Sequence, residues 1–146
     1  MREISARLIT EKVADLCIQA NYHLGQDVID AMKRGLEKEE SPTGRAILEQ
    51  LLENAAIAKE GEFPICQDTG IVNVFLKVGM GVRFETKRTL QELCDEGVRR
   101  GYLNPDNPLR ASVLDDPLFA RKNTRDNTPC ILHAALVPGD KVDVQV

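Results

Sequence analysis

The segment Val72-Asn73-Val74-Phe75-Leu76-Lys77-Val78 decides the fold, because the hydrophobic period of the chain changes to two at this point. The apolar residues at every second position would share one face of a β-strand, with Asn73 and Lys77 on the other face. Gly79 and Gly81 close this strand. The alternation therefore predicts a strand that buries one face and leaves the other more polar.

The sequence before this strand has helical periodicity. Apolar side chains recur at helical intervals over residues 4–20, then mark a second helix over 28–36 and a third that continues to Lys59. The third helix has a clear start signal, since Ser41 can cap a helix and Pro42 suits its first turn. We therefore expect helices to lead the fold.

The sequence after the strand predicts one more helix and a return to strands. Thr89-Leu90-Gln91-Glu92 resembles a capping box, and Gly101 is predicted to cap the far end of that helix. Residues 102–128 show neither period, and their scattered Leu, Phe and Val favour an ordered, functional loop. Two further strands are then expected, over 130–137 and 141–146, joined by Pro138-Gly139-Asp140.

These elements predict an α+β fold in which the N-terminal helices precede a short mixed or antiparallel sheet with a further helix. The 146 residues are predicted to form a single domain. A net charge of -4 argues against a nucleic-acid surface, which is normally basic. No apolar run approaches the roughly 20 residues of a membrane span. Because the N-terminus also lacks the apolar core of a signal peptide, we expect a cytoplasmic protein.

The four cysteines are widely spaced and are expected to be reduced thiols. Cys17 and Cys94 fall at apolar helical positions and Cys130 in an apolar strand, so these three are predicted to be buried core residues. Cys66 alone lies in a loop with polar neighbours.

The loop Pro64-Ile65-Cys66-Gln67-Asp68-Thr69-Gly70 is the main candidate site. A thiolate can hold a soft metal or the iron of a cluster, and the adjacent amide and carboxylate can hydrogen-bond a polar substrate. Gly70 allows a sharp turn or a close approach to a ligand. A polar loop before a strand is the alternative interpretation.

Other polar residues have simpler interpretations. His23 is predicted to be a surface or capping histidine. His133 is predicted to be a hydrogen-bonded core histidine, with a general-acid role as the alternative. A set of loop residues is expected to form side-chain turns, with a share in positioning the loop of Cys66 as the alternative: Asn123, Asp126, Asn127 and Thr128.

Three sequence blocks resemble the N-terminal part of the class I, iron–sulfur fumarate hydratases, a family that includes the alpha subunit of L(+)-tartrate dehydratase. The first block is the Cys66 loop preceded by Glu53-Asn54-Ala55-Ala56-Ile57-Ala58. The second is Asn107-Pro108-Leu109-Arg110-Ala111-Ser112 with Asp115-Asp116-Pro117-Leu118. The third is Arg121-Lys122-Asn123-Thr124-Arg125-Asp126-Asn127-Thr128-Pro129. The blocks occur in the matching order over nearly the whole chain.

The resemblance implies a 4Fe-4S cluster held by three cysteines, whose open iron acts as a Lewis acid in reversible addition of water to a carbon–carbon double bond. Cys66 matches the first cluster cysteine. Gln67 and Asp68 match residues that line the substrate site, and Asp68 is also the candidate for orienting a proton-transfer group. Arg110 matches an arginine that binds a substrate carboxylate, a task that suits its planar guanidinium.

The chain also departs from the family pattern. Arg125 stands where related subunits usually have glycine, and Cys130 where they usually have alanine. The second and third cluster cysteines of the family lie beyond the matched region, and the final strand has no closing signal. We therefore expect a fragment of a longer chain or assembly, inactive alone and completed by a beta subunit or C-terminal domain in an oligomer.

Three functions remain open at this point. The leading hypothesis is part of a fumarate hydratase that interconverts fumarate and malate, and the first alternative is the alpha subunit of L(+)-tartrate dehydratase. The second alternative is a non-catalytic standalone module that assembles with a complete hydratase.

Overall fold

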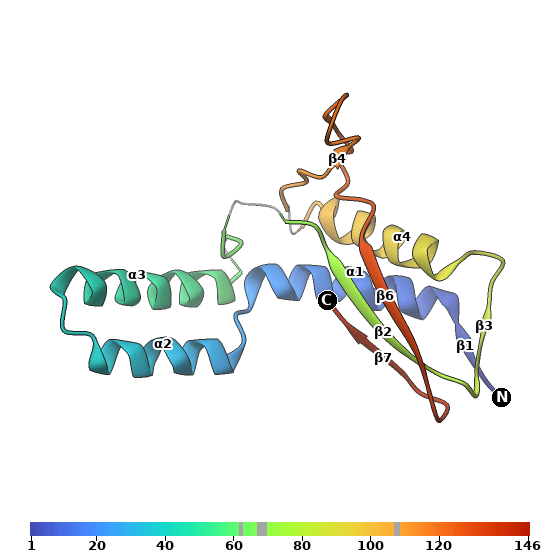
Figure 1. Cartoon of the computed structure of the whole chain (residues 1–146), viewed down its shortest axis with the longest axis horizontal. Coiled ribbons are helices and arrows are strands. Elements are labelled where there is room, and N and C mark those ends of the chain that lie inside the picture. The colour runs from blue at the N-terminus through green and yellow to red at the C-terminus, as the bar shows by residue number, and fades with distance from the viewer. Residues whose placement is uncertain (62, 67–69, 107–108) are drawn as a thin grey trace. The chain divides into compact units, whose positions relative to one another are not determined.

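The computed structural model describes residues 1–61, 63–66, 70–106 and 109–146 (Figure 1). It confirms the α+β class, and its contacts divide the chain into a larger unit, residues 1–18 with 68–146, and a smaller unit, residues 19–67. None of the helices in the described ranges is long and apolar enough to cross a membrane. The elements in chain order are β1 (Arg2–Ser5), α1 (Ala6–Tyr22), α2 (Gln26–Lys38), α3 (Pro42–Lys59), β2 (Asn73–Gly79), β3 (Val82–Glu85), α4 (Leu90–Tyr102), β4 (Leu114–Asp115), β5 (Lys122–Asn123), β6 (Ile131–Val137) and β7 (Val142–Gln145).

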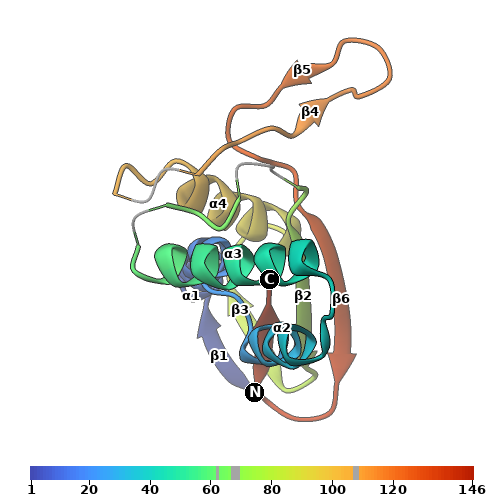
Figure 2. The ribbon, with the colours of Figure 1, turned by 90° about the vertical axis from the view of Figure 1, so that its left-hand side faces the viewer.

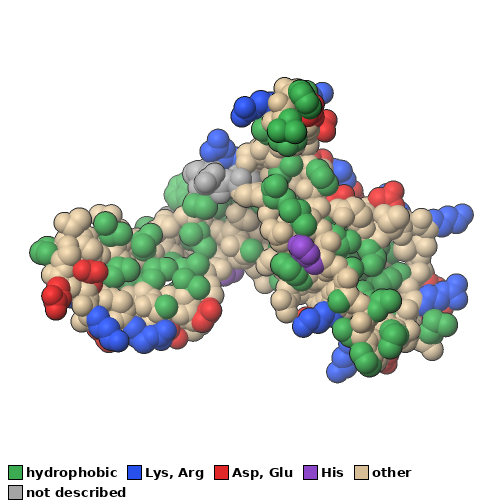
Figure 3. All heavy atoms as spheres, in the orientation of Figure 1, with side chains coloured by type: hydrophobic (Ala, Val, Ile, Leu, Met, Phe, Trp, Pro, Cys, Tyr) green, Lys and Arg blue, Asp and Glu red, His purple; other side chains and the backbone are tan. Residues whose placement is uncertain are grey.

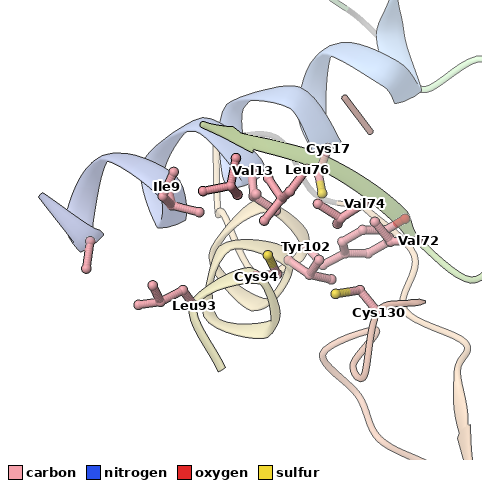
Figure 4. Packing of buried hydrophobic residues seen from close by; sticks show 13 residues of the cluster. Ile9, Val13, Cys17, Val72, Val74, Leu76, Leu93, Cys94, Tyr102 and Cys130 are labelled. Atoms are coloured by element: carbon pink, nitrogen blue, oxygen red, sulfur yellow. The ribbon is translucent and has the colours of Figure 1, made fainter. Parts of the chain in front are cut away.

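The strand predicted from the period of two is the centre of a mixed sheet. The order is β6-β2-β7, with β2 parallel to β6 and antiparallel to β7. Val74 and Leu76 on β2 are completely buried, and they pack in one cluster with side chains from α1 and α4 (Figure 4). The alternating apolar face is therefore the sheet side of the core.

Two glycines bring α4 close to α1. A Cβ atom at Gly97 would lie 2.7 Å from the backbone oxygen of Thr10, and one at Gly101 would lie 3.0 Å from that of Ala14. The capping box at Thr89 is confirmed, but the prediction that Gly101 ends the helix is wrong, because α4 continues to Tyr102. Gly101 is required by the close approach of another helix and not by the end of its own.

The first two residues of the predicted N-terminal helix, Ile4 and Ser5, belong to a strand instead, β1 (Arg2–Ser5). β1 pairs in parallel with β3, with Ile4 opposite Phe84, and α1 begins only at Ala6. This pairing is between segments far apart in sequence. Ile4 has helical spacing relative to the later apolar residues, so the sequence pattern placed it in a helix and gave no sign of the pairing with β3.

The segment expected to be an irregular loop contains a short hairpin. β4 and β5 pair antiparallel, and the hairpin projects from the larger unit beyond α4 (Figure 2). At its tip the Asp116 carboxylate accepts hydrogen bonds from the backbone N–H groups of Phe119, at 3.2 Å, and Ala120, at 3.1 Å. The described part of the segment is thus ordered, as predicted, although it is not free of strand structure.

The outer face of the three-stranded sheet carries His133. The prediction of a core histidine is wrong: His133 is exposed and its ring stacks on Phe75, with ring centroids 4.7 Å apart. Figure 3 shows this face with hydrophobic side chains around a histidine. Because β6 is an edge strand, its residues gain less burial than the apolar sequence suggests.

The smaller unit contains the consecutive helices α2 and α3, which pack against each other in antiparallel orientation (Figure 1). Ser41 caps α3, as predicted, by accepting a hydrogen bond from the Gly44 N–H at 3.3 Å. The Arg45 guanidinium donates to the Leu36 carbonyl oxygen at 2.7 Å, which satisfies a backbone group at the end of α2. His23, at the loop between α1 and α2, is exposed as predicted.

Candidate functional site

Cys66 is an exposed thiol on a segment that is anchored just before it. The Ile65 backbone N–H donates to the Asn21 carbonyl oxygen at 2.8 Å, and the Asn54 side-chain amide donates to the Ile65 carbonyl oxygen at 2.8 Å. Both backbone groups of the residue preceding the cysteine are therefore held within the smaller unit. Cys66 is exposed. Gln67 and Asp68 lie outside the described residues.

These contacts give the Glu53–Ala58 motif a structural role. The segment is the last part of α3, where Ala55 and Ala58 are buried and Asn54 faces the chain that returns toward Cys66. Small side chains let the helix pack closely, and the amide next to them fixes the loop. The sequence resemblance singled out this motif, but its hydrogen-bonding function was not predicted.

Asn127, in the third sequence block, connects that block within the larger unit to Ser112 of the second and to Gly70 at the end of the first. Its side-chain oxygen accepts from the Ser112 N–H at 3.1 Å and the Val113 N–H at 3.3 Å, and its amide donates to the Gly70 carbonyl oxygen at 3.2 Å. The residue is fully buried and has a φ of 59°. Asparagine suits this position because it tolerates the left-handed region and presents a donor and an acceptor together.

The second and third blocks are held together by further bonds. The Asn123 amide donates to the Ala111 carbonyl oxygen at 3.0 Å, and the Thr124 N–H donates to the Val113 carbonyl oxygen at 2.9 Å. Arg110 is exposed at the start of this pairing. The structure thus fixes the backbone directly after Arg110, which belongs to the larger unit, whereas Cys66 belongs to the smaller one.

An ion-pair network supports the third block from α4. Arg99 Nε lies 2.9 Å from Asp126 Oδ2, and the other oxygen of this carboxylate accepts from the Thr128 hydroxyl at 2.7 Å and the Thr128 N–H at 3.1 Å. Partial burial of Asp126 opposes ionisation, but the hydrogen bonds from Thr128 and Arg99 outweigh it and lower the pKa of the carboxyl group. Asp126 therefore stays charged and positions the turn that precedes β6.

Arg125 and Asn127 both have positive φ angles, of 68° and 59°. The conformation explains why glycine would suit position 125, since glycine adopts it without the steric cost of a Cβ atom. The Arg125 N–H donates to the Asn123 side-chain oxygen at 2.6 Å, and its own side chain is exposed to solvent. The substitution is accommodated by the turn.

The other three cysteines lie in the core of the larger unit (Figure 4). Cys17, Cys94 and Cys130 are buried, as predicted. Burial, with a smaller effect of the neighbouring Cys94, raises the pKa of Cys17 to about 12. The thiols of Cys94 and Cys130 share a hydrogen bond. This bond, together with burial, raises the pKa of Cys130, and the same bond lowers the pKa of Cys94.

These thiols do not form a complete cluster site. No group of three or more His, Cys, Asp or Glu side chains is placed to hold a metal ion in the parts of the chain that the structure describes. Cys66 fits the role of a single ligand, because it is an exposed thiol next to an anchored backbone. A cubane cluster needs further thiolates that the described residues do not bring to it.

The different environments of the cysteines predict their reactivity. In the native chain at pH 8, a thiol reagent such as DTNB should modify Cys66 rapidly and Cys17 more than a thousandfold more slowly. With a pKa of about 12, only about one Cys17 in 10⁴ would be ionised at this pH even if the reagent could reach it. Mass spectrometry of the modified peptides gives the order. Equal labelling of the four cysteines before denaturation would contradict the burial described above, and denatured protein supplies the control for full reactivity.

Comparison with known proteins places these features in a family context. The family model described as "Fumarate hydratase (Fumerase)" matches residues 10–146. A Methanocaldococcus jannaschii protein, provisionally named L(+)-tartrate dehydratase subunit alpha, is 34% identical over 119 residues, which cover 82% of this chain and 40% of that protein. The L(+)-tartrate dehydratase subunit alpha of Escherichia coli O157:H7 is 29% identical over 140 residues, or 94% of this chain and 45% of that protein. The chain thus spans less than half the length of these relatives.

Proposed function

Because the chain belongs to the fumarate hydratase family, we propose that it is part of an iron–sulfur hydro-lyase that interconverts fumarate and malate. The observation that carries the proposal is the anchored, exposed Cys66 within the family match, held by Asn54 and Asn21 through the backbone of the preceding residue. A fixed thiolate is what a cluster ligand requires. When bound, the cluster would supply a Lewis-acidic iron for the hydroxyl group that is added or removed.

In this proposal the chain's own residues bind and orient the substrate. Arg110 pairs with one substrate carboxylate, and the hydrogen bonds of Asn123 and Asn127 fix the backbone after it. Gln67 and Asp68 hydrogen-bond the substrate, and Asp68 orients a group that transfers a proton. The two remaining cluster cysteines and the other substrate anchors come from a beta subunit or C-terminal domain, so the chain alone is inactive. The assembly is oligomeric and cytoplasmic, consistent with four cysteines that are thiols.

A second candidate is the dehydration of L(+)-tartrate by the same kind of site. The names of the relatives favour it, since they are alpha subunits of L(+)-tartrate dehydratase. Tartrate carries a hydroxyl group that malate lacks, and the proposed roles of Cys66 and Arg110 suit either substrate. The non-catalytic module remains the third candidate, supported by the lack of a complete metal-binding group among the described side chains.

The test is anaerobic turnover by the native assembly isolated through this chain. We expect fumarate hydration that is lost in air and restored by iron and a reductant. Turnover of tartrate alone would replace the first candidate with the second. An assembly with neither activity, and with no iron or acid-labile sulfide, would favour the non-catalytic module.

Replacing Cys66 with serine should abolish this activity. Loss of one thiolate removes the proposed attachment of the cluster, and with it several kcal/mol of transition-state stabilisation, or more than about 100-fold in kcat/KM. Iron and sulfide content should fall with the activity, while the Tm of the chain should change little because Cys66 is exposed. The matched control is Cys130→Ala, which changes a buried thiol of the core. A Cys66→Ser assembly with normal iron content would refute the assigned role.

A further inference from the structure

A groove with an apolar floor and a cationic rim lies along the edge of the sheet in the larger unit. Its volume is about 310 Å³, and β1, the start of α1 and β7 line it. The floor consists of the side chains of Ile4, Leu8, Ile9, Val142 and Val144. Arg2, Lys12 and Lys141 complete the lining, which includes no carboxylate among the described residues.

One side of the strand at this groove has no neighbouring strand among the described residues. β7 is the last strand in the order β6-β2-β7, as Figure 1 shows. The Gly79 N–H donates to the Lys141 carbonyl oxygen at 2.8 Å, which makes positions 79 and 141 a hydrogen-bonded pair. Hydrogen-bonded and non-bonded pairs alternate in an antiparallel ladder, so the backbone groups of Val142 and Val144 point away from β2. The residues that line the groove with their side chains therefore also present backbone donors and acceptors at the edge.

Among the described residues, the side chains of Lys12 and Arg2 at the rim make long contacts within the chain. Lys12 Nζ lies 3.5 Å from Asp15 Oδ2, with both side chains more than half exposed. Arg2 Nη1 lies 3.5 Å from the Asp140 carbonyl oxygen. Such contacts are long and solvent-screened, so the positive charges remain available to an incoming carboxylate. Leu8 in the floor still has 48% of its surface exposed.

We propose that this edge binds an extended acidic segment of the polypeptide that completes the hydratase. The segment would add a strand to β7, bonding the outward N–H and C=O groups of Val142 and Val144. Apolar side chains on one of its faces would cover the floor, and its carboxylates would pair with Lys12 and Lys141. The proposal rests on the proposed function, because that function requires the beta subunit or C-terminal domain that would supply this segment. A second copy of this chain pairing through the same edge does not fit, since it would bring the same three cations to it.

Zero-length crosslinking of amines to carboxylates in the native assembly identifies which polypeptide occupies the groove. Treatment with a carbodiimide should join Lys12 or Lys141 to Asp or Glu residues of the completing polypeptide, as identified by mass spectrometry. The assembly is reconstituted with a mixture of ¹⁴N- and ¹⁵N-labelled chains, so that links between copies appear as mixed-isotope pairs. Mixed pairs at these lysines would make the occupant a second copy and overturn the proposal. So would the absence of any link at these lysines.

Substitutions test the two parts of the recognition separately. Lys12→Glu with Lys141→Glu should weaken association at least tenfold, whereas the matched change Lys87→Glu, on an exposed residue outside the groove, should not. Val144→Pro removes an outward N–H and should weaken association by a similar factor, with a smaller fall in Tm than Asp143→Pro, because it loses side-chain packing but no hydrogen bond to β2. Asp143→Pro removes an N–H that faces β2 and should lower the Tm. Equal association of Val144→Pro and the unchanged chain would overturn the added strand.

Hydrogen exchange separates this inference from the proposed function. The amides of Val142 and Val144 should exchange at least tenfold more slowly in the assembly than in the isolated chain. Unchanged exchange in an active assembly would overturn the edge inference and leave the function standing. Slowed exchange and correct links in an assembly that turns over neither fumarate nor tartrate would overturn the function and support the edge.

Discussion

Replacing Gly97 with alanine is expected to lower the free energy of unfolding of the larger unit by about 3 kcal/mol. The new Cβ atom would lie 2.7 Å from the Thr10 backbone oxygen and 2.7 Å from Val13 Cβ. Neither atom is the end of a flexible side chain, so α1 must move relative to α4 and disturb the core around Cys94. Alanine is the better helix former by about 1 kcal/mol, but this gain is smaller than the cost of the clash.

Gly35→Ala is the matched control for this prediction. Gly35 is also within a helix, but a Cβ atom there would meet only Leu48 Cδ1, at 3.7 Å, which is ordinary van der Waals contact. This variant should be neutral or more stable by up to about 1 kcal/mol. Urea unfolding of both variants, followed by circular dichroism, measures the difference. Similar stabilities for the two variants would contradict the close approach of α1 and α4.

The second large effect is expected from Asn127→Ala, at about 3 kcal/mol or more. The change removes the acceptor of two hydrogen bonds from the half-buried Ser112 and Val113, and the donor of a third to the Gly70 carbonyl. Each lost bond costs about 1 kcal/mol, and alanine is also less suited to a φ of 59°. In the native assembly this variant should lower kcat/KM as well, because the backbone after Arg110 loses its support.

Asn104→Ala provides the comparison for Asn127→Ala. Among the described residues, the Asn104 side chain accepts one hydrogen bond, from the Asp106 N–H at 3.0 Å, in an exposed turn. Its removal should cost less than about 1 kcal/mol. Asn127→Asp keeps the two acceptor bonds but loses the donor to Gly70 and buries a charge, so it should also be destabilised. Hydrogen exchange at Ser112 and Val113 should accelerate in Asn127→Ala, and unchanged protection there would argue against its linking role.

Sequence patterns correctly predicted the elements that depend on residues close together in the chain. Ser41 and Thr89 both cap helices because their side chains bond the first turn of their own helix. The alternation around Val74 predicted the central strand, because one face of β2 packs against helices. Features set by distant contacts were missed. β1 forms through pairing with β3, and Gly101 serves packing against α1, which a glycine near a helix end does not reveal.

For the candidate site too, features set by nearby residues were predicted and features set by distant contacts were missed. The apolar patterns predicted the burial of Cys17, Cys94 and Cys130, and the polar loop distinguished Cys66, which is exposed. The alternative considered for Asn127, a share in positioning the loop of Cys66, is closer to the structure than a simple turn, since its amide bonds Gly70. Neither Asn127 nor Asn54 has a sequence signal for its partner, because each bonds backbone groups that only the folded chain brings near. Their place inside the family motifs was the available clue.

The order of the sheet has a consequence for the way the chain acquires its structure. The central strand β2 ends at Gly79, yet both of its neighbours come from the segment after Cys130. During synthesis β2 therefore leaves the ribosome with two unpaired edges and a hydrophobic face. The three-stranded sheet cannot form until both partners of β2, β6 and β7, have followed. Loop closure over this length makes the larger unit a slow folder with high contact order, whereas the α2–α3 pair can form from neighbouring residues at once.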